Sequence, residues 1–480
     1  MLRLPFALML LTTASFATSL EAATKPNILF LFADDQRPDT IHALGNEQIR
    51  TPQLDRLVER GMAFTQAHIM GGLQGAVCVP SRAMLMSGRS LFRVDEKLGK
   101  ETLLPAHLAS AGYATFGTGK WHNGPQSYAR AFNGGGPVFL GGMTNQFQVK
   151  VHPFAALAAG NMNRTETNDQ HATELFANAA IEFIQQPRTE PFFCYVAFTA
   201  PHDPRQSPPE YARMYDPAQI KLPANYLPIH PLNNGEMRVR DEMLAPWPRT
   251  EAEVRRHLAD YYGIISHLDA QIGRILKALE ATGKLDNTIV VFAADNGLAI
   301  GSHGLFGKQN LYEHSMGVPL VISGPGVKRG QRSAAMCYSF DLFPTLCELA
   351  GVNVPSEVEG QSLMPVLRGE CEQHRDTLFF AYRGVQRAVR DERYKLIRYP
   401  QINKSQLFDL VADPHELVDL AYVPERAERV TAMTQLLART QQQWGDDLPL
   451  STETPQPLRL SAEQLTKDAP RAGKQPAKAK

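Results

Sequence analysis

The sequence has few cysteines, five in 480 residues, and no two of them form a Cys-x-x-Cys pair. This absence argues against a structural zinc site. The five are Cys78, Cys194, Cys337, Cys347 and Cys371. Their odd number leaves one without an intramolecular partner, and if that one is Cys78, the other four can pair in three ways. Cys194 lies in the apolar run PFFCYVAF, where we expect a buried, unreactive thiol.

The chain also lacks an excess of charge of either sign, with 49 basic and 49 acidic residues. Because no basic stripe is interleaved with aromatic residues, we expect no nucleic-acid partner. No segment is long and apolar enough to predict a membrane span. The apolar stretch within residues 1–23 follows Arg3 and ends in small residues, which is typical of a secretory signal peptide. We therefore predict an exported protein, periplasmic or secreted; the alternative for this stretch is a buried N-terminal helix.

Four apolar runs without alternation predict buried parallel strands. They cover residues 27–35, 113–122, 191–204 and 288–297. Helical patterns lie between them, at residues 51–61, 103–112, 173–186 and 253–283. Strands that alternate with helices predict an α/β fold built on a large, doubly wound, mixed but mostly parallel sheet that is flanked by helices. We expect this domain to span residues 24–375.

The pattern changes near residue 376 to short alternating runs, followed by a helical pattern. The runs cover 377–383, 387–399 and 405–410, and the helical pattern covers 426–444. They predict a small antiparallel sheet with a packed helix, in a C-terminal subdomain over residues 376–450. The final segment, 451–480, ends in polar, basic and Pro-containing sequence, and we predict a disordered tail there.

Polar side chains stand at the carboxyl ends of the four predicted strands. They are Asp34 and Asp35, Lys120 and His122, His202, and Asp295 and Asn296. Because the carboxyl ends of parallel strands form the ligand crevice of an open sheet, these four clusters predict one shared site. Residues 124–168, rich in Gly and Asn, and 203–250, rich in Pro, are interpreted as long functional loops above it.

Asp34 and Asp35 are adjacent carboxylates at a buried strand end, and two such charges need a counter-cation. An isolated Asp-Asp pair is often only a helix cap or turn. Asp295 and Asn296, which arrive from another strand, add further oxygen ligands. A set of oxygen donors favours a hard cation, Ca²⁺ or Mg²⁺, over zinc.

Basic side chains can supply the opposite charge and can transfer protons. The candidates are Lys120, His122, His202 and Lys308. Cations that converge beside a bound metal suit a tetrahedral dianion or a monoester of similar charge. Each of these residues alone is more often a surface lysine or a core histidine with a backbone partner. His303 is ambiguous because it lies close to Lys308. Structural roles are expected for His171, His230, His257, His267 and His314.

Cys78 begins the stretch CVPSRAMLMSGR. Pro80 suits the first position of a helix and Gly88 suits its end, so Cys78 is expected just before a helix N-terminus, which favours negative charge. Arg82 follows about one turn later. Three interpretations stay open for Cys78: a structural thiol, a thiolate nucleophile of lowered pKa, or a residue that is chemically converted.

This stretch resembles the Cys-x-Pro-Ser-Arg signature of the type I sulfatases, members of the alkaline phosphatase-like superfamily in which the cysteine is oxidised to Cα-formylglycine. Other segments are similar to motifs of that family, in the family's order from residue 25 to about 420. They are KPNILFLFADDQRPD, AGYATFGTGKWH, TAPHDP, VVFAADNG with HGLFGKQNLYEHSMGVPLVISGPG, and LFDLVADPHELVDL.

The resemblance implies that Asp34, Asp35, Asp295 and Asn296, with modified Cys78, bind one Ca²⁺. It also implies that Arg82 and Lys120 hold the formylglycine hydrate and the sulfate. His202 and Lys308 then face the leaving oxygen, with His202 as general acid, and His122 takes a proton from the hydrate.

The expected function is that of a secreted sulfatase which removes a sulfate ester from a carbohydrate, with exo-type access. An enzyme that converts Cys78, either a formylglycine-generating or an anaerobic sulfatase-maturating enzyme, is the implied protein partner. Two alternatives stay open: a phosphonate or phosphate monoester hydrolase of the same superfamily, and a catalytically silent glycan-binding homologue.

Overall fold

The computed structural model describes residues 25–466, so the predicted signal peptide and residues 467–480 of the predicted tail lie outside the described part. The helices are α1 (Pro52–Arg60), α2 (Cys78–Ser87), α3 (Leu104–Ser110), α4 (Pro125–Ala131), α5 (Phe154–Ala158), α6 (Ala172–Gln185), α7 (Pro209–Ala212), α8 (Glu251–Ala281), α9 (Glu313–Met316), α10 (Leu342–Leu349), α11 (Met364–Arg368), α12 (Ala427–Trp444) and α13 (Ala462–Thr466). The strands are β1 (Asn27–Asp34), β2 (Gly61–Phe64), β3 (Ala67–His68), β4 (Gly71–Gly72), β5 (Ala114–Lys120), β6 (Gly134–Phe139), β7 (Val149–Pro153), β8 (Glu166–Asn168), β9 (Phe192–Pro201), β10 (Thr288–Ala294), β11 (Leu320–Ser323), β12 (Gln331–Ser333), β13 (Cys337–Tyr338), β14 (Leu378–Tyr382), β15 (Gln386–Arg390), β16 (Tyr394–Tyr399) and β17 (Lys404–Asp409).

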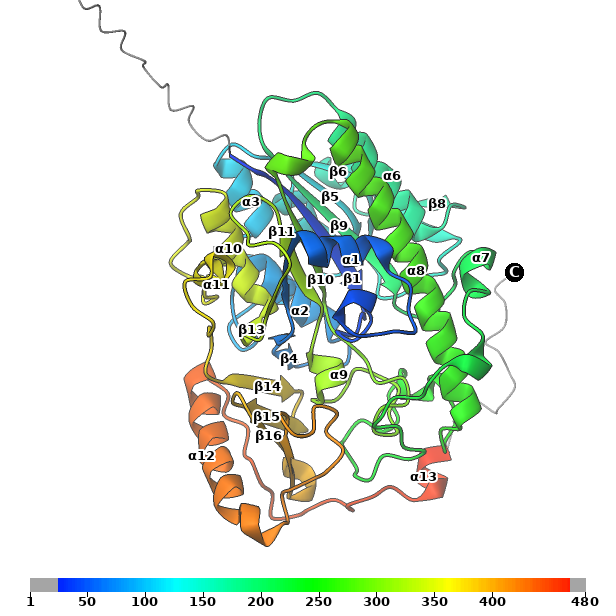
Figure 1. Cartoon of the computed structure of the whole chain (residues 1–480), viewed down its shortest axis with the longest axis vertical. Helices are drawn as coiled ribbons and strands as arrows, with labels where there is room; N and C mark the ends of the chain where they lie inside the picture. The colour runs from blue at the N-terminus through cyan, green and yellow to red at the C-terminus, as the bar shows by residue number, and fades with distance from the viewer. Residues whose placement is uncertain (1–24, 467–480) are drawn as a thin grey trace, which may run out of the picture.

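A ten-stranded sheet forms the centre of the protein, in the order β12-β2-β11-β10-β1-β9-β5-β6-β7-β8 (Figure 1). Its middle strands, from β10 to β6, run parallel, while antiparallel pairs occur toward both edges. Every residue of β1 is buried, as expected for a strand covered on both faces. The predicted mixed, mostly parallel sheet flanked by helices is confirmed.

Helices cover both faces of this sheet. On one face α1 and α6 pack against α8, and on the other α2 packs against α3 and α10 (Figure 1). The long helix α8 is capped by Thr250, whose hydroxyl accepts a hydrogen bond from the backbone N–H of Glu253. Its fully buried Ile264, Leu268 and Ile272 recur every four residues, which is the spacing of one helical face.

Residues 124–168 are not the long loop expected from their Gly and Asn content. They form α4, α5 and strands β6 to β8, which extend the central sheet. The glycines of β6 leave room for aromatic rings: a Cβ at Gly135 would come within 2.7 Å of Phe154 and 2.8 Å of Tyr128. A glycine run therefore looks like a loop in the sequence although it is a strand covered by rings.

Residues 203–250 do form a long connection, in which α7 is the one α-helix. Among residues 25–466, none of the helices combines the length and apolarity needed to cross a bilayer. All five cysteines are free; Cys371 is exposed and the other four are buried, Cys194 fully, as expected for an unreactive thiol.

The predicted C-terminal sheet consists of antiparallel strands β14 to β17, with α12 packed against it. A fifth strand comes from the main domain, since β4 pairs in parallel with β14. A Cβ at Gly71 of β4 would lie 2.0 Å from the carbonyl oxygen of Ala381, so only glycine allows this approach.

Residues 451–466 differ from the predicted disordered tail. They end in α13, and the backbone N–H of Asn233 donates a hydrogen bond of 2.7 Å to the carbonyl of Leu458. The apolar Leu465 is buried. The described part of the tail is therefore attached to the 203–250 connection rather than free.

Asp341, at the start of α10, joins three distant segments. Its fully buried carboxylate accepts hydrogen bonds from the backbone N–H groups of Tyr338 and Gln361 and from Arg375 Nε, at 2.9, 2.8 and 2.8 Å. Burial opposes ionisation, but Arg375 outweighs it and lowers the pKa of Asp341 to about 2. Because the folded pKa is below the usual value of 3.8, this carboxylate stabilises the fold above pH 4 and loses that effect as the pH falls toward 2.

We predict that Asp341→Asn lowers the free energy of unfolding by about 3–5 kcal/mol at pH 7, because it leaves the buried Arg375 without a charged partner. Urea denaturation measures this change. Glu280→Gln, which removes the exposed partner of Arg56, is the matched control and should cost less than about 1 kcal/mol. Equal costs for the two variants would contradict the prediction, as would a cost for Asp341→Asn that does not shrink at lower pH.

Candidate active site

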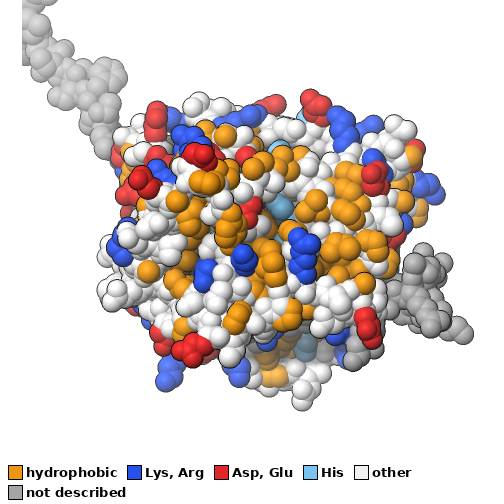
Figure 2. Space-filling model, turned by 90° about the horizontal axis from the view of Figure 1, so that it is seen from below, with side chains coloured by type: hydrophobic (Ala, Val, Ile, Leu, Met, Phe, Trp, Pro, Cys, Tyr) orange, Lys and Arg blue, Asp and Glu red, His pale blue; other side chains and the backbone are white. Residues whose placement is uncertain are grey.

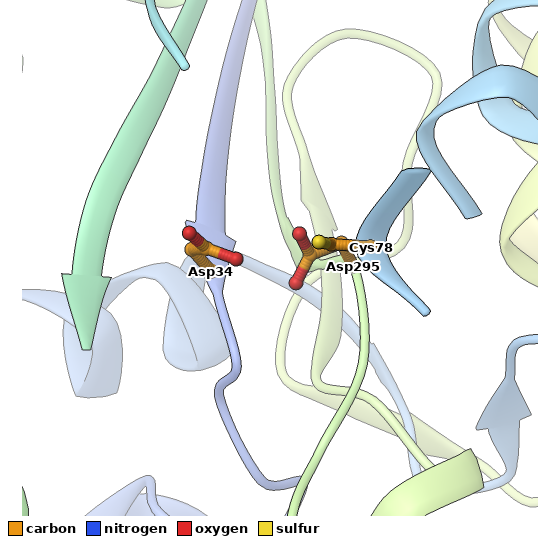
Figure 3. Close-up of side chains that lie close together, drawn as sticks. All are labelled: Asp34, Cys78 and Asp295. Atoms are coloured by element: carbon orange, nitrogen blue, oxygen red, sulfur yellow. The ribbon is translucent and has the colours of Figure 1, made fainter. Parts of the chain in front are cut away.

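Three acidic side chains meet at the carboxyl edge of the central sheet. Asp34 ends β1, Asp35 follows it, and Asp295 follows β10, and all three are buried. In Figure 3 the carboxylates of Asp34 and Asp295 and the thiol of Cys78 point toward one another. One ligand atom from each of these three lies within 4.8 Å of the others, which is close enough to share an ion.

Several observations test whether a hard cation fits this place. Asp34 Oδ1 and Asn296 Oδ1 are buried oxygens without a hydrogen-bond partner. Burial and then the nearness of Asp34 raise the pKa of Asp295 to about 7, because like charges disfavour ionisation. Carboxylate and amide oxygens are the donors that Ca²⁺ and Mg²⁺ prefer. The residues present therefore fit a hard divalent cation.

Each carboxylate is paired with a basic side chain from a different element. Lys120 Nζ, at the end of β5, lies 2.5 Å from Asp34 Oδ2. Arg82, in α2, donates hydrogen bonds to Asp295 Oδ2 and to the carbonyl of Lys120, both at 2.9 Å. Lys308 Nζ lies 2.5 Å from Asp35 Oδ1. The three acids and three bases balance one another in charge.

Cys78 is the first residue of α2, and Val77 occupies the N-cap position. Pro80 is therefore the third helical residue and not the first, because the helix starts two residues earlier than the sequence suggested, while Gly88 ends the helix in the left-handed conformation as predicted. The thiol is 1% exposed, with Sγ 3.2 Å from His122 Nδ1 and 3.8 Å from Lys120 Nζ. Burial outweighs the nearby lysines and raises the pKa of the Cys78 thiol to about 11. In this arrangement the thiol is protonated at neutral pH.

The two predicted site histidines contact different members of the cluster, His122 the thiol of Cys78 and His202 the carboxylate of Asp35. Burial, followed by the charges of Lys120 and Arg82, lowers the pKa of His122 to about 2. His202 Nε2 lies 3.5 Å from Asp35 Oδ2, and His202 Nδ1 lies 2.7 Å from the carbonyl of Asp203. Burial lowers the pKa of His202, although Asp35 opposes this shift. All ten predicted site residues thus converge on one place.

The five histidines that were expected to have structural roles, His171, His230, His257, His267 and His314, are all buried. His303, which the sequence left ambiguous, stacks on Tyr312 with ring centroids 3.9 Å apart. Its Nε2 lies 2.9 Å from the carbonyl of Glu416, in the C-terminal subdomain. His303 therefore belongs to the contact between the two sheets and not to the candidate site.

A chain of polar contacts beside His202 was missed in the sequence. Arg240 donates to both carboxylate oxygens of Asp203 and, at 2.8 Å, to Asp241 Oδ1. Gln309 Nε2 donates to Asp241 Oδ2 at 2.7 Å and to the carbonyl of Gly75 at 3.0 Å. The one sequence signal was Asp203 directly after His202, since Arg240 and Asp241 lie in a segment without periodicity.

Glu242 fixes the loop that carries Lys308. Its buried carboxylate accepts hydrogen bonds from the backbone N–H groups of Phe306, at 3.0 Å, and Gly307, at 2.8 Å, and from Arg249 Nη2 at 2.7 Å. These contacts fix the backbone directly before Lys308, so the side chain of Lys308 extends to Asp35 from a backbone that is held in place.

Figure 2 shows the lower face of the molecule, where hydrophobic side chains gather around a recess with a histidine in it.

A cleft of about 1240 Å³ lies away from the candidate site, between the edge of the central sheet and the C-terminal subdomain. Glu313, which lines this cleft, lies within 2.9 Å of His68, Arg390 and the buried Lys395. Neither Cys78 nor the three site carboxylates line it. The candidate catalytic residues therefore gather at the strand ends and not in this cleft.

Comparison with known proteins assigns this arrangement to a family. The sulfatase family profile matches residues 26–352, and a profile for the C-terminal region of N-sulphoglucosamine sulphohydrolase matches residues 301–443. The chain is similar to N-acetylglucosamine-6-O-sulfatase of Bacteroides thetaiotaomicron, with 28% identity over 92% of this chain and 91% of that protein. It is also similar to an arylsulfatase of Clostridium perfringens, with 28% identity over 86% of this chain and 94% of the relative.

Solved structures share the fold. The protein BT4656, solved in complex with its substrate D-glucosamine-2-N,6-O-disulfate, has a TM-score of 0.72 at 24% identity and covers 89% of this chain and 99% of its own. The phosphonate monoester hydrolase of Agrobacterium radiobacter has a TM-score of 0.70 at 23% identity, over 91% of this chain and 100% of its own. Since the sulfatase profile spans well over half of the sequence and the relatives align along nearly its whole length, the chain belongs to the sulfatase family and is a sulfuric ester hydrolase.

Proposed function

We propose that the protein removes sulfate esters from a carbohydrate, with Cys78, once converted to formylglycine, as the nucleophilic residue. The observation that supports this most directly is the place of Cys78, whose thiol lies close to the carboxylates of Asp34 and Asp295 and also to Lys120 and His122. A sulfate monoester needs a nucleophile next to its sulfur and cations next to its oxygens, and the surroundings of Cys78 offer both.

Asp34, Asp35, Asp295 and Asn296, with the modified Cys78, would hold one Ca²⁺. When bound, the ion supplies Lewis-acid polarisation of oxygens. Because the three acids and three bases of the chain already balance, a divalent cation would give the site a net positive charge. That charge attracts an anionic sulfate monoester.

The hydrate of formylglycine supplies two hydroxyl groups on one carbon, which neither serine nor cysteine can offer. Arg82 and Lys120 would hold these hydroxyls and neutralise charge on the sulfate. His122 would accept a proton from the second hydroxyl. Burial and the neighbouring cations lower its pKa and keep the imidazole neutral in the free chain, and the charge of a bound sulfate would raise that pKa again and make the ring a better base.

His202 and Lys308 would face the oxygen that leaves with the alcohol, with His202 as the proton donor. Burial disfavours its charged form in the free chain, but a bound sulfate anion would favour that form and raise the pKa of His202. The contact of His202 Nδ1 with the carbonyl of Asp203 directs the opposite ring nitrogen, Nε2, toward the site.

We predict that His202→Ala lowers kcat/KM by roughly 10²–10⁴-fold for a sugar sulfate, whose leaving oxygen needs a proton. The loss should be much smaller for nitrophenyl sulfate, because nitrophenolate leaves without protonation. Steady-state kinetics on both substrates measures the contrast, with His42→Ala, at an exposed position, as the control. A similar loss on both substrates would contradict a proton-donating role.

A carbohydrate substrate is supported by the relatives, among them the N-acetylglucosamine-6-O-sulfatase named above and an ulvan-active sulfatase of Formosa agariphila that is 28% identical over 84% of this chain. The long 203–250 segment beside the strand ends suits access by a chain terminus, which is exo-type action. A phosphonate or phosphate monoester is the second candidate substrate, because a neighbour with that activity shares the fold and the same charges would bind a phosphonate.

We predict sulfate release from at least one member of a panel of defined sulfated saccharides, and faster hydrolysis of an aryl sulfate than of the matched aryl phosphonate monoester. Ion chromatography of free sulfate and release of the aryl alcohol measure these rates. A preference for the phosphonate would favour the second candidate. Complete inactivity on all substrates, with Cys78 shown to be modified, would exclude the proposed function.

The conversion of Cys78 requires a partner, a formylglycine-generating or anaerobic sulfatase-maturating enzyme, and we include export through a signal peptide at residues 1–23 in the proposal. Without that conversion the chain would be a silent glycan-binding homologue. Both questions concern covalent structure, so mass spectrometry of the protein from its native host addresses them together.

We predict that tryptic peptides from that host contain the aldehyde at Cys78 and that the mature chain begins near residue 24. A Cys78→Ala variant, which cannot be converted, should lose activity and serves as the control. Only unmodified cysteine in the native protein would support the silent homologue, and an intact residue 1–23 segment in the exported fraction would argue against a cleaved signal. The protein has to come from its native host, because a host without the maturating enzyme would leave Cys78 unmodified in any case.

A further inference from the structure

The backbone of Asp35 is in the left-handed region, with φ of 65°. This conformation is unfavourable for a residue other than glycine, although Asp adopts it more readily than most, so neighbouring groups are needed to hold it. Asp35 follows the last residue of β1 and is one of the residues expected to hold the cation. The turn at this position decides where its carboxylate points.

Two side chains hold the backbone of Asp35, one at each polar group. Its N–H donates to Asp295 Oδ1 at 2.9 Å, and its carbonyl accepts from the Tyr261 hydroxyl at 2.6 Å. The same hydroxyl accepts from the backbone N–H of Arg37 at 2.9 Å. Tyr261 thus bridges the residues on both sides of the turn with one oxygen atom.

Tyr261 comes from α8, on the face of the sheet that this helix covers, and it is fully buried. Its hydroxyl has no other role among the described contacts, and a hydroxyl that is buried at this depth needs such partners. The turn that it holds is also attached to the second ligand segment: Arg37 Nη1 donates to the carbonyls of Leu298 and Ala299, at 3.3 and 2.7 Å. Arg37 therefore connects the segment after β1 to the segment after β10, close in sequence to Asp35 and Asp295.

We propose that Tyr261 is a positioning residue for the cation site: its hydroxyl fixes the left-handed turn at Asp35 and so keeps the carboxylate of Asp35 aimed at the ion, without touching the ion itself. This inference rests on the proposed Ca²⁺ site. Removal of a partner that orients a metal ligand typically weakens metal binding by 10–100-fold. Tyr261→Phe removes only the hydroxyl and keeps the packing of the ring.

The neighbouring Tyr262 provides a matched control. It is also buried in α8, but its hydroxyl only accepts a hydrogen bond of 3.4 Å from Asn46 Nδ2, away from the turn. Tyr262→Phe therefore makes the same chemical change in the same helix, one residue further along, without changing any contact of Asp35.

The experiment is calorimetric titration of the full chain, freed of metal with a chelator, with Ca²⁺ and separately with Mg²⁺. Wild type, Tyr261→Phe and Tyr262→Phe are prepared from the same host, so that the state of Cys78 is the same. Tyr261→Phe should weaken Ca²⁺ binding roughly tenfold or more, while Tyr262→Phe should match wild type. The rise in melting temperature on adding Ca²⁺ should shrink only in Tyr261→Phe, and this second measurement needs no activity.

Three outcomes would contradict the proposal. Ca²⁺ binding by Tyr261→Phe equal to that of wild type would overturn the proposal and leave the Ca²⁺ site intact. Equal weakening in both variants would also overturn it, because the effect would then come from the packing of α8. A wild-type chain that binds neither ion would overturn the Ca²⁺ site of the proposed function and this inference with it. Melting temperatures of the metal-free variants show whether both have folded.

Discussion

The burial of three carboxylates at one edge of a sheet is the constraint on which this site depends. Asp34, Asp35 and Asp295 cannot all ionise in a dry environment unless positive charge lies close by. Each finds its basic partner on another element, in α2, at the end of β5 or in the loop that carries Lys308. The charges balance only once these elements are in place, so the ion pairs of the active centre also hold elements of the fold together. Loss of one partner would leave a buried charge without compensation.

Most of the side chains in these ion pairs are carried by rigid elements. The acids stand at the ends of buried strands, and Arg82 lies inside α2, so their positions follow from the register of the sheet and its packing. Lys308 is the exception, because it comes from a loop. Glu242 compensates for this by binding the two backbone N–H groups before it. Binding energy of an anionic substrate is then available for the chemistry rather than for ordering the site.

The strands, the fold class and the site residues could be predicted from the sequence because each leaves a local pattern in it. The strands are apolar runs that end abruptly in polar residues, and Arg82 follows Cys78 by one helical turn, so fold class and site could be predicted together. Sequence reasoning could not find what depends on packing. The strand β6 looked like a loop because its glycines are covered by rings from elsewhere. Tyr261 looks like any core aromatic, since only the docking of α8 brings its hydroxyl to a carbonyl 226 residues away.

The pairing of β4 with β14 sets an order of events in time. Cys78 lies six residues after β4, yet the strand that completes β4 ends only at Tyr382. At roughly 5–20 residues per second, synthesis from one point to the other takes about 15–60 s. During that interval β4 lacks its partner β14, whereas in the finished fold the nearby side chain of Cys78 is 1% exposed. The C-terminal subdomain thus completes a strand pairing that begins just before Cys78, so this segment reaches its final surroundings only after most of the chain has been made.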